Sequence, residues 1–315
     1  MQHNLDIIVP LYNEEGNIIP LYNKIKETLK SINYSIIFIN DGSIDTSYTV
    51  LEELYNKDKK HIKVINFSRN FGKEAAMYAG LKKSTSDYAV IIDADLQHDP
   101  KYILDMYNYL ETHPEFDEIA AVNKYEKELF IKRLLKRTFY KIISRLSGLD
   151  LKIGASDFRM FRNYVVNSLI EMSEYNRFSK GLFAYIGFNI YYMDYEPNKR
   201  LSGKSKFKLN KQISYAKDGI LSTSTKPLKI ANVVGTLLSI SSFIYLIVIV
   251  LQTLIYGKDI PGYASLMCIM LLLGGIELLV LGILGEYISR IYNEVKNRPI
   301  YIEKNTLGIK NKSKD

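Results

Sequence analysis

Acidic side chains follow two apolar runs of the sequence, at the points where the runs end. Asp93 and Asp95 come directly after Tyr88–Ile92, and Asp41 follows Ser35–Asn40. In an extended segment residues i and i+2 face the same way, so Asp93 and Asp95 can present two carboxylates to one ligand. Because close carboxylates repel each other unless a cation lies between them, this spacing favours Mg²⁺ or Mn²⁺, which prefer oxygen ligands. Turn-forming aspartates after a strand are the alternative for such a pair taken alone.

The elements that must position these carboxylates form an alternating series of apolar, β-branched runs and helical patterns. We expect strands at Leu5–Pro10, Ser35–Asn40, Ile62–Phe67 and Tyr88–Ile92, and helices at Asn17–Ser31, Asp45–Asn56, Gly72–Lys83 and Pro100–Glu111. Such alternation predicts an α/β fold with a mostly parallel sheet covered on both faces. Ligands of these sheets bind at the carboxyl ends of the strands, where the acidic motifs fall. The sequence has neither GxGxxG nor GxxxxGK[ST], so a dinucleotide-binding fold and a P-loop NTPase each lack their phosphate-binding loop.

Two long apolar stretches near the C-terminal end are predicted to cross a membrane. The first span is expected at about residues 230–256, which carry no charged side chain. The second is expected at about residues 263–287, within a stretch from residue 260 to residue 285 whose one charged side chain is Glu277. Each stretch has the roughly 20 apolar residues that a spanning helix needs. Glu277 either makes a polar contact to another subunit or a lipid headgroup, or is hydrogen-bonded to the neighbouring helix near the inner leaflet.

Basic residues flank these two stretches on their outer sides, whereas the link between them carries only Lys258, balanced by Asp259. The positive-inside bias therefore places both ends in the cytoplasm. We expect a cytoplasmic catalytic domain at residues 1–225, a transmembrane hairpin at 226–290 and a cytoplasmic basic tail at 291–315. These features predict a multi-pass protein of the inner (cytoplasmic) membrane. Gly235 and Ser239 offer a seam of small residues for helix packing, and we expect a homo-oligomer.

The basic residues of the chain, whose formal net charge is +8, are concentrated in residues 124–148 and 199–229. Because this charge is not spread over a nucleic-acid-binding face, we expect no nucleic-acid partner. At about residues 129–147 apolar residues recur at helical spacing opposite the cations, which predicts an amphipathic helix in the membrane interface. An ordinary surface helix is the alternative, and residues 205–222 show the same pattern more weakly. The single cysteine, Cys268, excludes an internal disulfide.

Several motifs resemble those of the GT-A glycosyltransferases of family 2. They are VPLYNEEGNI (9–18), INDGSIDTS (39–47), FSRNFGKEAAMYAGL (67–81) and DADLQHDP (93–100). More narrowly, RLSGKSKFKLNK (200–211), KDGILSTSTKPL (217–228) and GEYISRIYNEVKNRP (285–299) are similar to the polyprenyl-phosphate glycosyltransferases, the group of dolichyl-phosphate mannose synthase and undecaprenyl-phosphate glucosyltransferase. The resemblance covers nearly the whole chain and implies a GT-A domain with a membrane hairpin.

The resemblance implies roles for particular side chains. The nucleotide pocket is expected to include Pro10, Tyr12, Glu14 and Asp41. A divalent cation, Mg²⁺ or Mn²⁺, is expected on Asp93, Asp95 and Gln97, where it neutralises the departing nucleoside diphosphate. Positive charge near the diphosphate is expected from Arg69 and Lys73, and a flexible phosphate clamp from Arg200, Ser205 and Lys206. The alternative for the first pair is that it begins a helix exposed to solvent. The alternative for the clamp residues is that they form a basic loop facing the membrane.

Asp157 matches the position that the family assigns to the catalytic base. The nucleophile is expected to be a phosphate monoester, which is largely dianionic at neutral pH and has little need of proton abstraction. The alternatives are that Asp157 orients the sugar hydroxyls or pairs with Arg159. Arg133 and Arg137 are candidates to receive the lipid phosphate.

These observations predict inverting transfer of one hexose, from UDP-glucose to undecaprenyl phosphate, at the cytoplasmic face of the membrane for cell-envelope glycosylation. Another donor (UDP-N-acetylglucosamine, GDP-mannose or a UDP-aminoarabinose derivative) and a non-catalytic nucleotide-sugar-binding subunit are the alternatives. The QxxRW element of processive polysaccharide synthases is missing, and Glu174–Phe178 stands roughly in its place. Its absence favours a single transfer over chain growth.

Overall fold

The structure is a computed structural model of the 315-residue chain, and it describes residues 4–123, 130–198, 218–256 and 262–309. These fall into two compact units. One comprises residues 1–219 together with residues 299–315, and the other comprises residues 220–298. The hairpin is thus inserted between two segments of the first unit, so the chain leaves and re-enters the catalytic domain.

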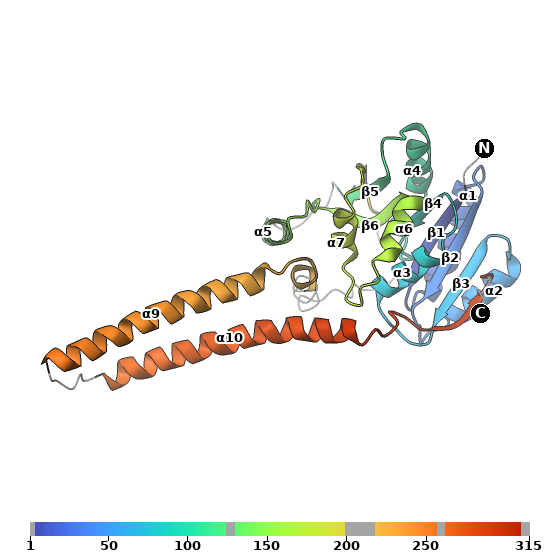
Figure 1. Ribbon diagram of the computed structural model, residues 1–315. Coiled ribbons are helices and arrows are strands. Elements are labelled where there is room, and N and C mark those ends of the chain that lie inside the picture. Colours follow the sequence, from blue (N-terminus) through green and yellow to red (C-terminus); the bar gives the residue numbers. More distant parts are fainter. Residues whose placement is uncertain (1–3, 124–129, 199–217, 257–261, 310–315) are drawn as a thin grey trace. The chain divides into compact units, whose positions relative to one another are not determined.

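The first unit is built on one mixed sheet of eight strands in the order β7-β5-β6-β4-β1-β2-β3-β8 (Figure 1). Its centre is parallel and consists of β4 (Tyr88–Ile91), β1 (Leu5–Leu11), β2 (Tyr34–Asn40) and β3 (Ile62–Phe67). These strands lie within two residues of the predicted ones at each end. The mostly parallel α/β sheet that the alternating pattern predicted is therefore confirmed.

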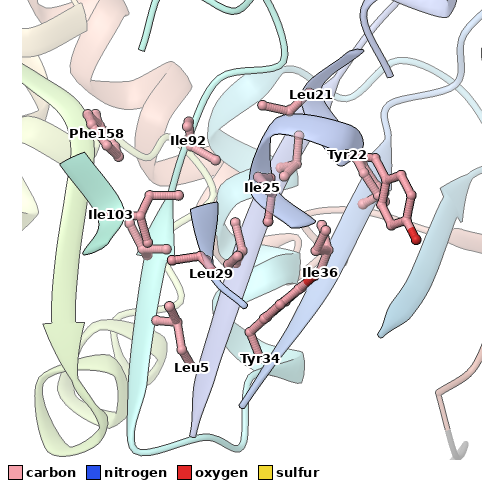
Figure 2. Close-up of a cluster of buried hydrophobic side chains, with 14 of the residues drawn as sticks. Leu5, Leu21, Tyr22, Ile25, Leu29, Tyr34, Ile36, Ile92, Ile103 and Phe158 are labelled. Atoms are coloured by element: carbon pink, nitrogen blue, oxygen red, sulfur yellow. The ribbon is translucent and has the colours of Figure 1, made fainter. Parts of the chain in front are cut away.

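Helices cover both faces of this sheet because successive strand residues point to opposite sides. On one face Leu5, Ile7 and Val9 of β1 pack against α1 (Glu15–Thr28), α2 (Ser47–Lys57) and α4 (Lys101–Thr112), as Figure 2 shows for part of this cluster. On the other face Ile8 packs against α3 (Lys73–Lys83), α6 (Asn163–Glu171) and α7 (Ser179–Tyr185). A Cβ on Gly80 of α3 would lie 2.3 Å from Ile8 Cγ2, so glycine permits the close approach of this helix.

Beyond β4 the sheet continues with β6 (Ala155–Arg162), β5 (Glu118–Asn123) and β7 (Ile190–Tyr195). β6 is antiparallel to both of its neighbours. Arg159 of β6 forms an ion pair of 2.7 Å with Glu118 of β5, and both side chains are buried. The amphipathic helix predicted at about residues 129–147 is α5 (Phe130–Ser147).

The segment predicted as a cytoplasmic basic tail, residues 291–315, contains a strand that the sequence pattern did not predict. Residues Glu303–Leu307 form β8, which pairs antiparallel with β3 at the edge of the sheet. The ring of Tyr301 stacks on Phe67 at 4.9 Å, and Ser68 N donates to Ile302 O at 3.0 Å. The strand was missed because its sequence, EKNTL, lacks an apolar run, and its stability comes from a partner more than 200 residues away.

The second unit contains two long helices, α9 (Lys226–Tyr256) and α10 (Tyr263–Val295). Both are long and apolar enough to cross a membrane, and their apolar side chains are largely exposed. α10 continues eight residues past the predicted end of the second span at residue 287. Tyr287 of α10 donates its hydroxyl to Ser224 O at 2.7 Å. Of the helix predicted at residues 205–222, only 218–222 fall among the described residues, and these are helical.

Candidate active site

The loops that follow β1, β2 and β3 are joined at the carboxyl edge of the sheet. Asn13 N donates to Ser43 Oγ at 2.9 Å, and Glu14 N donates to Ser47 Oγ at 3.0 Å. Ile44 N donates to Asn13 Oδ1 at 2.9 Å. These hydrogen bonds fix the loop after β1 against the loop after β2. The expected nucleotide residues Pro10, Tyr12 and Glu14 lie along this segment, with Pro10 buried in β1 and Tyr12 and Glu14 half-buried.

Asp41 connects the loop after β2 to the loop after β3. Its carboxylate accepts hydrogen bonds from Phe71 N at 2.6 Å and Gly72 N at 2.9 Å, and its side chain is buried. Burial raises the pKa of Asp41 to about 6, although the two backbone donors act in the opposite direction. Gly42 has a φ of +62°, and a Cβ there would lie 2.3 Å from the carbonyl carbon of Arg69. Asp41 therefore holds the loop after β3 against the loop after β2, a role that its strand-end position did not predict.

Arg69, in the loop after β3, is exposed, and its guanidinium lies over the ring of Phe71 at 4.8 Å. Lys73, the other cation of the predicted pair, is 42% exposed but is held in ion pairs, whereas Arg69 forms none among the described residues. Arg69 is thus free to move toward a bound diphosphate without breaking an ion pair among the described residues.

The segment after β4 alternates between more and less exposed side chains. Asp93, Asp95 and Gln97 are partly exposed, whereas the residues between them are buried. Gln97 N donates to Asp95 Oδ1 at 3.1 Å, which closes a turn at Leu96, whose φ is +60°. The alternation agrees with the expectation that the i and i+2 carboxylates share one side.

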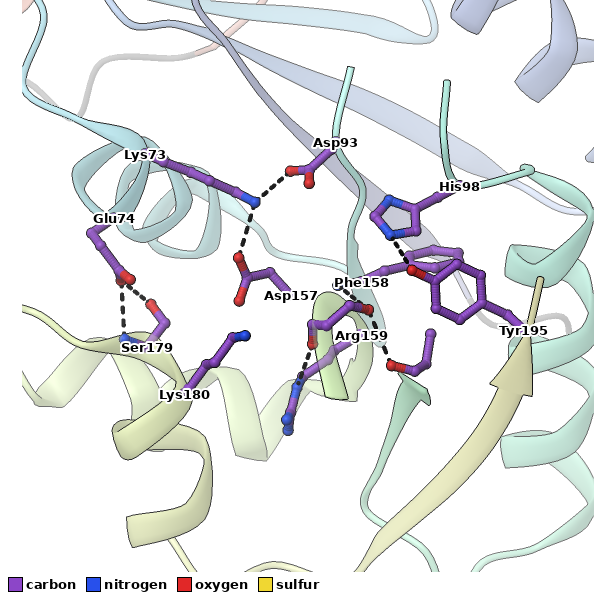
Figure 3. Close-up of polar contacts among 12 residues, drawn as sticks. Lys73, Glu74, Asp93, His98, Asp157, Phe158, Arg159, Ser179, Lys180 and Tyr195 are labelled. Atoms are coloured by element: carbon purple, nitrogen blue, oxygen red, sulfur yellow. Dashed lines mark hydrogen bonds and ion pairs between the residues drawn. The ribbon is translucent and has the colours of Figure 1, made fainter. Parts of the chain in front are cut away.

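Lys73 brings together two carboxylates that are distant in sequence. Its Nζ lies 2.6 Å from Asp93 Oδ1 and 2.9 Å from Asp157 Oδ2 (Figure 3). Lys73 begins α3, Asp93 follows β4 and Asp157 lies on β6, so three elements meet here. The sequence suggested a cation near a diphosphate at position 73 but gave no sign of this bridge, because the contact joins residues that no short motif contains.

The ion pair fixes the protonation state of Asp157. Burial alone would raise the pKa of this carboxyl, but the ammonium of Lys73 holds the pKa of Asp157 well below its usual range. A carboxylate with so low a pKa is a weak proton acceptor at neutral pH, which argues against general-base catalysis. The alternative pairing with Arg159 is not formed, since the Arg159 guanidinium binds Glu118.

A half-buried carboxylate, that of Glu74, connects α3 to α7 next to Lys73. Glu74 Oε2 accepts hydrogen bonds from Ser179 N, at 3.0 Å, and from the Ser179 hydroxyl. Burial raises the pKa of Glu74 to about 7, and the nearby charge of Asp157 acts in the same direction. The bonds join the start of α3 to the start of α7. Glu74 lies within the motif at residues 67–81, but no role was predicted for it or for Ser179.

His98 anchors the turn that carries Asp93 and Asp95. Its ring is buried, Nε2 lies 3.0 Å from the Tyr195 hydroxyl, and the ring packs on Phe158 at a centroid distance of 4.9 Å. Burial lowers the pKa of His98, so the ring is neutral at physiological pH. Its Nδ1 has no hydrogen-bond partner among the described residues.

The other predicted site residues lie where the structure gives no side-chain contacts. Arg200, Ser205 and Lys206 fall outside the described residues. Arg133 and Arg137 lie on α5, and their side chains also fall outside the description.

The residues after β4 fit a divalent cation of the Mg²⁺ or Mn²⁺ type. They provide two carboxylates and one amide on the exposed side of the turn, and Asp93 already binds a cationic group, the ammonium of Lys73. Within the described ranges no three or more His, Cys, Asp or Glu side chains gather closely enough to hold a metal ion by themselves. Mg²⁺ sites commonly have one or two carboxylates and complete their coordination with water and substrate phosphates.

Comparison with known proteins places these features in a family. Residues 6–170 match the model of glycosyl transferase family 2, and residues 226–291 match that of the GtrB C-terminal hairpin. The chain is 39% identical over 303 residues to a putative glycosyltransferase, CsbB, of Bacillus subtilis (strain 168), covering 95% of this chain and 91% of that protein. It is 35% identical over 304 residues to the bactoprenol glucosyl transferase of Shigella phage SfII, covering 95% and 97%.

A solved structure shares the fold. Glucosyl-3-phosphoglycerate synthase from Mycobacterium tuberculosis, in complex with Mn²⁺, uridine diphosphate and phosphoglyceric acid, superposes with a TM-score of 0.51. The match covers 70% of this chain and 76% of that one at 15% identity, which supports a common fold alone. The chain is therefore an enzyme of glycosyl transferase family 2 with a GT-A fold and a GtrB-type C-terminal hairpin, as its motifs predicted.

Proposed function

We propose that the protein transfers one glucose residue from UDP-glucose to undecaprenyl phosphate. The observation that carries this proposal is similarity to a bactoprenol glucosyl transferase along 95% of the chain, through both the catalytic domain and the hairpin. The hairpin matters because an enzyme for a lipid acceptor must hold its site at the headgroups. The linked carboxylates and lysine at the edge of the sheet provide a polar site suited to a charged donor.

In this proposal Asp93, Asp95 and Gln97 hold Mg²⁺ or Mn²⁺. The cation would supply Lewis-acid stabilisation of the departing diphosphate. The joined loops after β1 to β3, with Pro10, Tyr12 and Glu14, would hold the nucleotide, and Arg69 would add positive charge. The phosphate clamp proposed for Arg200, Ser205 and Lys206 would complete the donor site.

The chemistry itself requires positioning more than proton transfer. A phosphate oxygen of the acceptor forms a bond to the anomeric carbon as the bond from that carbon to the UDP oxygen breaks, and UDP leaves with the electron pair. In-line attack inverts the anomeric centre and gives a β-linked lipid sugar. Because the acceptor is already an anion, Asp157 is better suited to orient the sugar hydroxyls through its free oxygen while Lys73 fixes its position.

The hairpin of α9 and α10 would place this site at the cytoplasmic face of the inner membrane, with both ends of the chain in the cytoplasm. Arg133 and Arg137 on α5 are proposed to draw the lipid phosphate to the interface. The product would serve cell-envelope glycosylation, and packing at Gly235 and Ser239 would produce a homo-oligomer.

The donor is tested with purified protein, undecaprenyl phosphate and a panel of radiolabelled UDP-glucose, UDP-N-acetylglucosamine and GDP-mannose. We expect label in the organic phase only with UDP-glucose, and a β linkage by NMR of the product. Reactions without lipid serve as the control. Transfer from a different donor would replace glucose in the proposal, and donor binding without transfer from any of them would favour a non-catalytic binding subunit.

A further inference from the structure

The charges of the residues around Asp157 would repel a negatively charged acceptor. One ammonium, that of Lys73, is shared between the carboxylates of Asp93 and Asp157, so these three groups together carry a net negative charge. A phosphate monoester carries close to two negative charges at neutral pH. Because like charges at close range repel, an acceptor that approaches Asp157 needs a cation that these carboxylates do not already neutralise.

Lys180 of α7 is such a cation. Its side chain points toward Asp157 from the side opposite Lys73, as Figure 3 shows. Burial would raise the pKa of Asp157, and Lys73 and then Lys180 lower it, which agrees with the closeness of Lys180. Among the described residues the Lys180 ammonium forms no ion pair, and its polar contact is a long one of 3.4 Å to the neutral Tyr140 hydroxyl.

The other cation near this position is already neutralised. Arg159 donates from Nη1 to Glu118 Oε1 at 2.7 Å, and both of these side chains are buried. Arg159 and Lys180 line the same narrow pocket, together with Tyr140 of α5, Lys152 and one carboxylate, that of Asp150. Lys152 is exposed and lies over the ring of Tyr192 at 5.4 Å. Of these three cations, Lys180 is the one whose side chain is aimed at Asp157, and it forms no ion pair within the described part of the chain.

The fold holds Lys180 in this place through Glu74. Glu74 follows Lys73 directly in α3, and its carboxylate accepts both the backbone N–H and the hydroxyl of Ser179, which directly precedes Lys180. This contact connects the first turn of α3, which carries Lys73, to the first turn of α7, which carries Lys180. The two lysine side chains lie on either side of Asp157. Lys180 also contacts α5 through Tyr140, and α5 is the basic amphipathic helix expected at the lipid interface.

We propose that Lys180 binds the phosphate monoester of the acceptor and brings it to the reacting carbon beside Asp157. The inference rests on the proposed function, since it locates the acceptor phosphate of that reaction. It divides the work of the two lysines. Lys73 fixes the carboxylates of the donor site, and Lys180 offsets the repulsion between Asp157 and the incoming phosphate.

The test compares Lys180→Gln and Lys180→Arg with a matched control, Lys24→Gln, in the full-length protein; Lys24 is an exposed lysine of α1 outside this pocket. Steady-state transfer is measured against undecaprenyl phosphate and, separately, against UDP-glucose. We expect Lys180→Gln to raise the acceptor KM at least tenfold while the donor KM changes less than twofold. Lys180→Arg retains the charge and should stay within threefold of wild type for both substrates, as should Lys24→Gln.

Two further arms identify what Lys180 recognises. A soluble short-chain prenyl phosphate should show the same rise in KM, and inorganic phosphate should inhibit the wild type more strongly than Lys180→Gln. A defect seen only with the long-chain lipid in vesicles would assign Lys180 to the membrane surface and overturn the proposal. An unchanged acceptor KM in Lys180→Gln, or an equal rise in donor KM, would also overturn it. Failure of the proposed function would look different, because the wild type itself would then not transfer glucose.

Discussion

The two sides of Asp157 are built in different ways. On one side, here called the donor side, the loops after β1, β2, β3 and β4 carry motif residues that directly follow predicted strands. On the other, the acceptor side, α5, β6 and α7 bring Tyr140, Arg159 and Lys180 together from segments without a recognisable motif. The donor side is therefore specified by short stretches of sequence, whereas the acceptor side is specified by tertiary contacts. Variants on the two sides should separate donor effects from acceptor effects.

The largest effect is expected on the donor side. Asp95→Asn removes a charge from the proposed cation site but leaves the turn hydrogen bond from Gln97 N possible. Transfer should fall on the order of 10²–10³-fold, with weaker binding of UDP-glucose in the presence of Mn²⁺. Calorimetry of donor binding and the transfer assay together check this. Activity within tenfold of wild type would discard the assignment of Asp95.

Asp157→Asn should also be severe, but with a different signature. The change removes the charge of one of the two carboxylates that pair with Lys73. Transfer should therefore fall about 10²-fold, while the dissociation constant for UDP-glucose stays nearly constant. The pH profile of the variant should keep the shape of the wild-type profile between pH 6 and pH 8, because Asp157 is ionised throughout that range in the wild type. Loss of the acidic limb from the profile of the variant would instead restore the role of general base, because a general base loses activity when it is protonated at low pH.

The buried pair beneath the acceptor side should control stability more than donor binding. Glu118→Gln leaves the charge of Arg159 buried without its partner, and breaking such a pair costs about 3–5 kcal/mol. Thermal unfolding of the purified protein measures the loss as a lower midpoint. Glu303→Gln is the control, because its pair with Lys83, at 3.1 Å, is partly exposed and should contribute at most about 1 kcal/mol. Equal shifts for both variants would contradict the account.

A variant in β8 tests whether the donor side depends on residues near the C-terminal end of the chain. Asn66 Nδ2 donates to Asn305 Oδ1, and Asn40 Nδ2 donates to Asn66 Oδ1, each at 2.8 Å. Asn40 Oδ1 in turn accepts from Ser43 N in the loop after β2, at 3.3 Å. Asn305→Leu leaves Asn66 without this acceptor partner and should destabilise the protein by about 1–3 kcal/mol.

Donor KM should rise in the same variant, by a few-fold. Removal of residues 310–315, which follow the strand, is the control and should change neither quantity. A normal donor KM in a clearly destabilised Asn305→Leu protein would show that the amide chain supports the fold without shaping the site.

The smallest effect concerns the pH dependence of stability. Because burial raises the pKa of Asp41 to about 6 in the folded chain, from an ordinary value of 3.8, the folded state binds this proton more tightly than the unfolded state. Asp41 therefore favours folding at low pH, and this contribution is lost as the pH rises from about 4 to about 6. In Asp41→Asn the midpoint of thermal unfolding should therefore change less with pH between about pH 4 and about pH 6 than it does in the wild type. If the unfolding midpoint of the variant still depends on pH as in the wild type, groups other than Asp41 cause that pH dependence.

The comparison of the two sides also explains which parts of the structure the sequence predicted. The four parallel strands and their helices follow from periodicity. Asp93 and Asp95 are both partly exposed, with a buried residue between them, as expected for residues i and i+2 of an extended segment. β8 was missed because EKNTL has no pattern of its own and is stabilised by β3. The contact of Lys73 with Asp157 joins residues 84 positions apart, and that of Glu74 with Ser179 joins residues 105 positions apart. Local pattern carries no information about such pairings.

Insertion of the hairpin between residues 219 and 299 has a practical consequence for truncation. Removing everything after residue 230 would also remove β8 and expose the edge of β3. A fair test of the anchor replaces only residues 220–298 with a flexible linker. Donor binding should then persist, while transfer to undecaprenyl phosphate in vesicles should fall.

The most direct test of the account is metal-dependent transfer by the wild-type protein. Purified protein is incubated with labelled UDP-glucose and undecaprenyl phosphate, first with a chelator and then with Mg²⁺ or Mn²⁺ restored. The account predicts no lipid-linked glucose in the chelator and recovery of transfer with either ion, but no recovery in Asp95→Asn. Lipid-linked glucose that forms at the same rate in the chelator would contradict the cation site at the edge of the sheet.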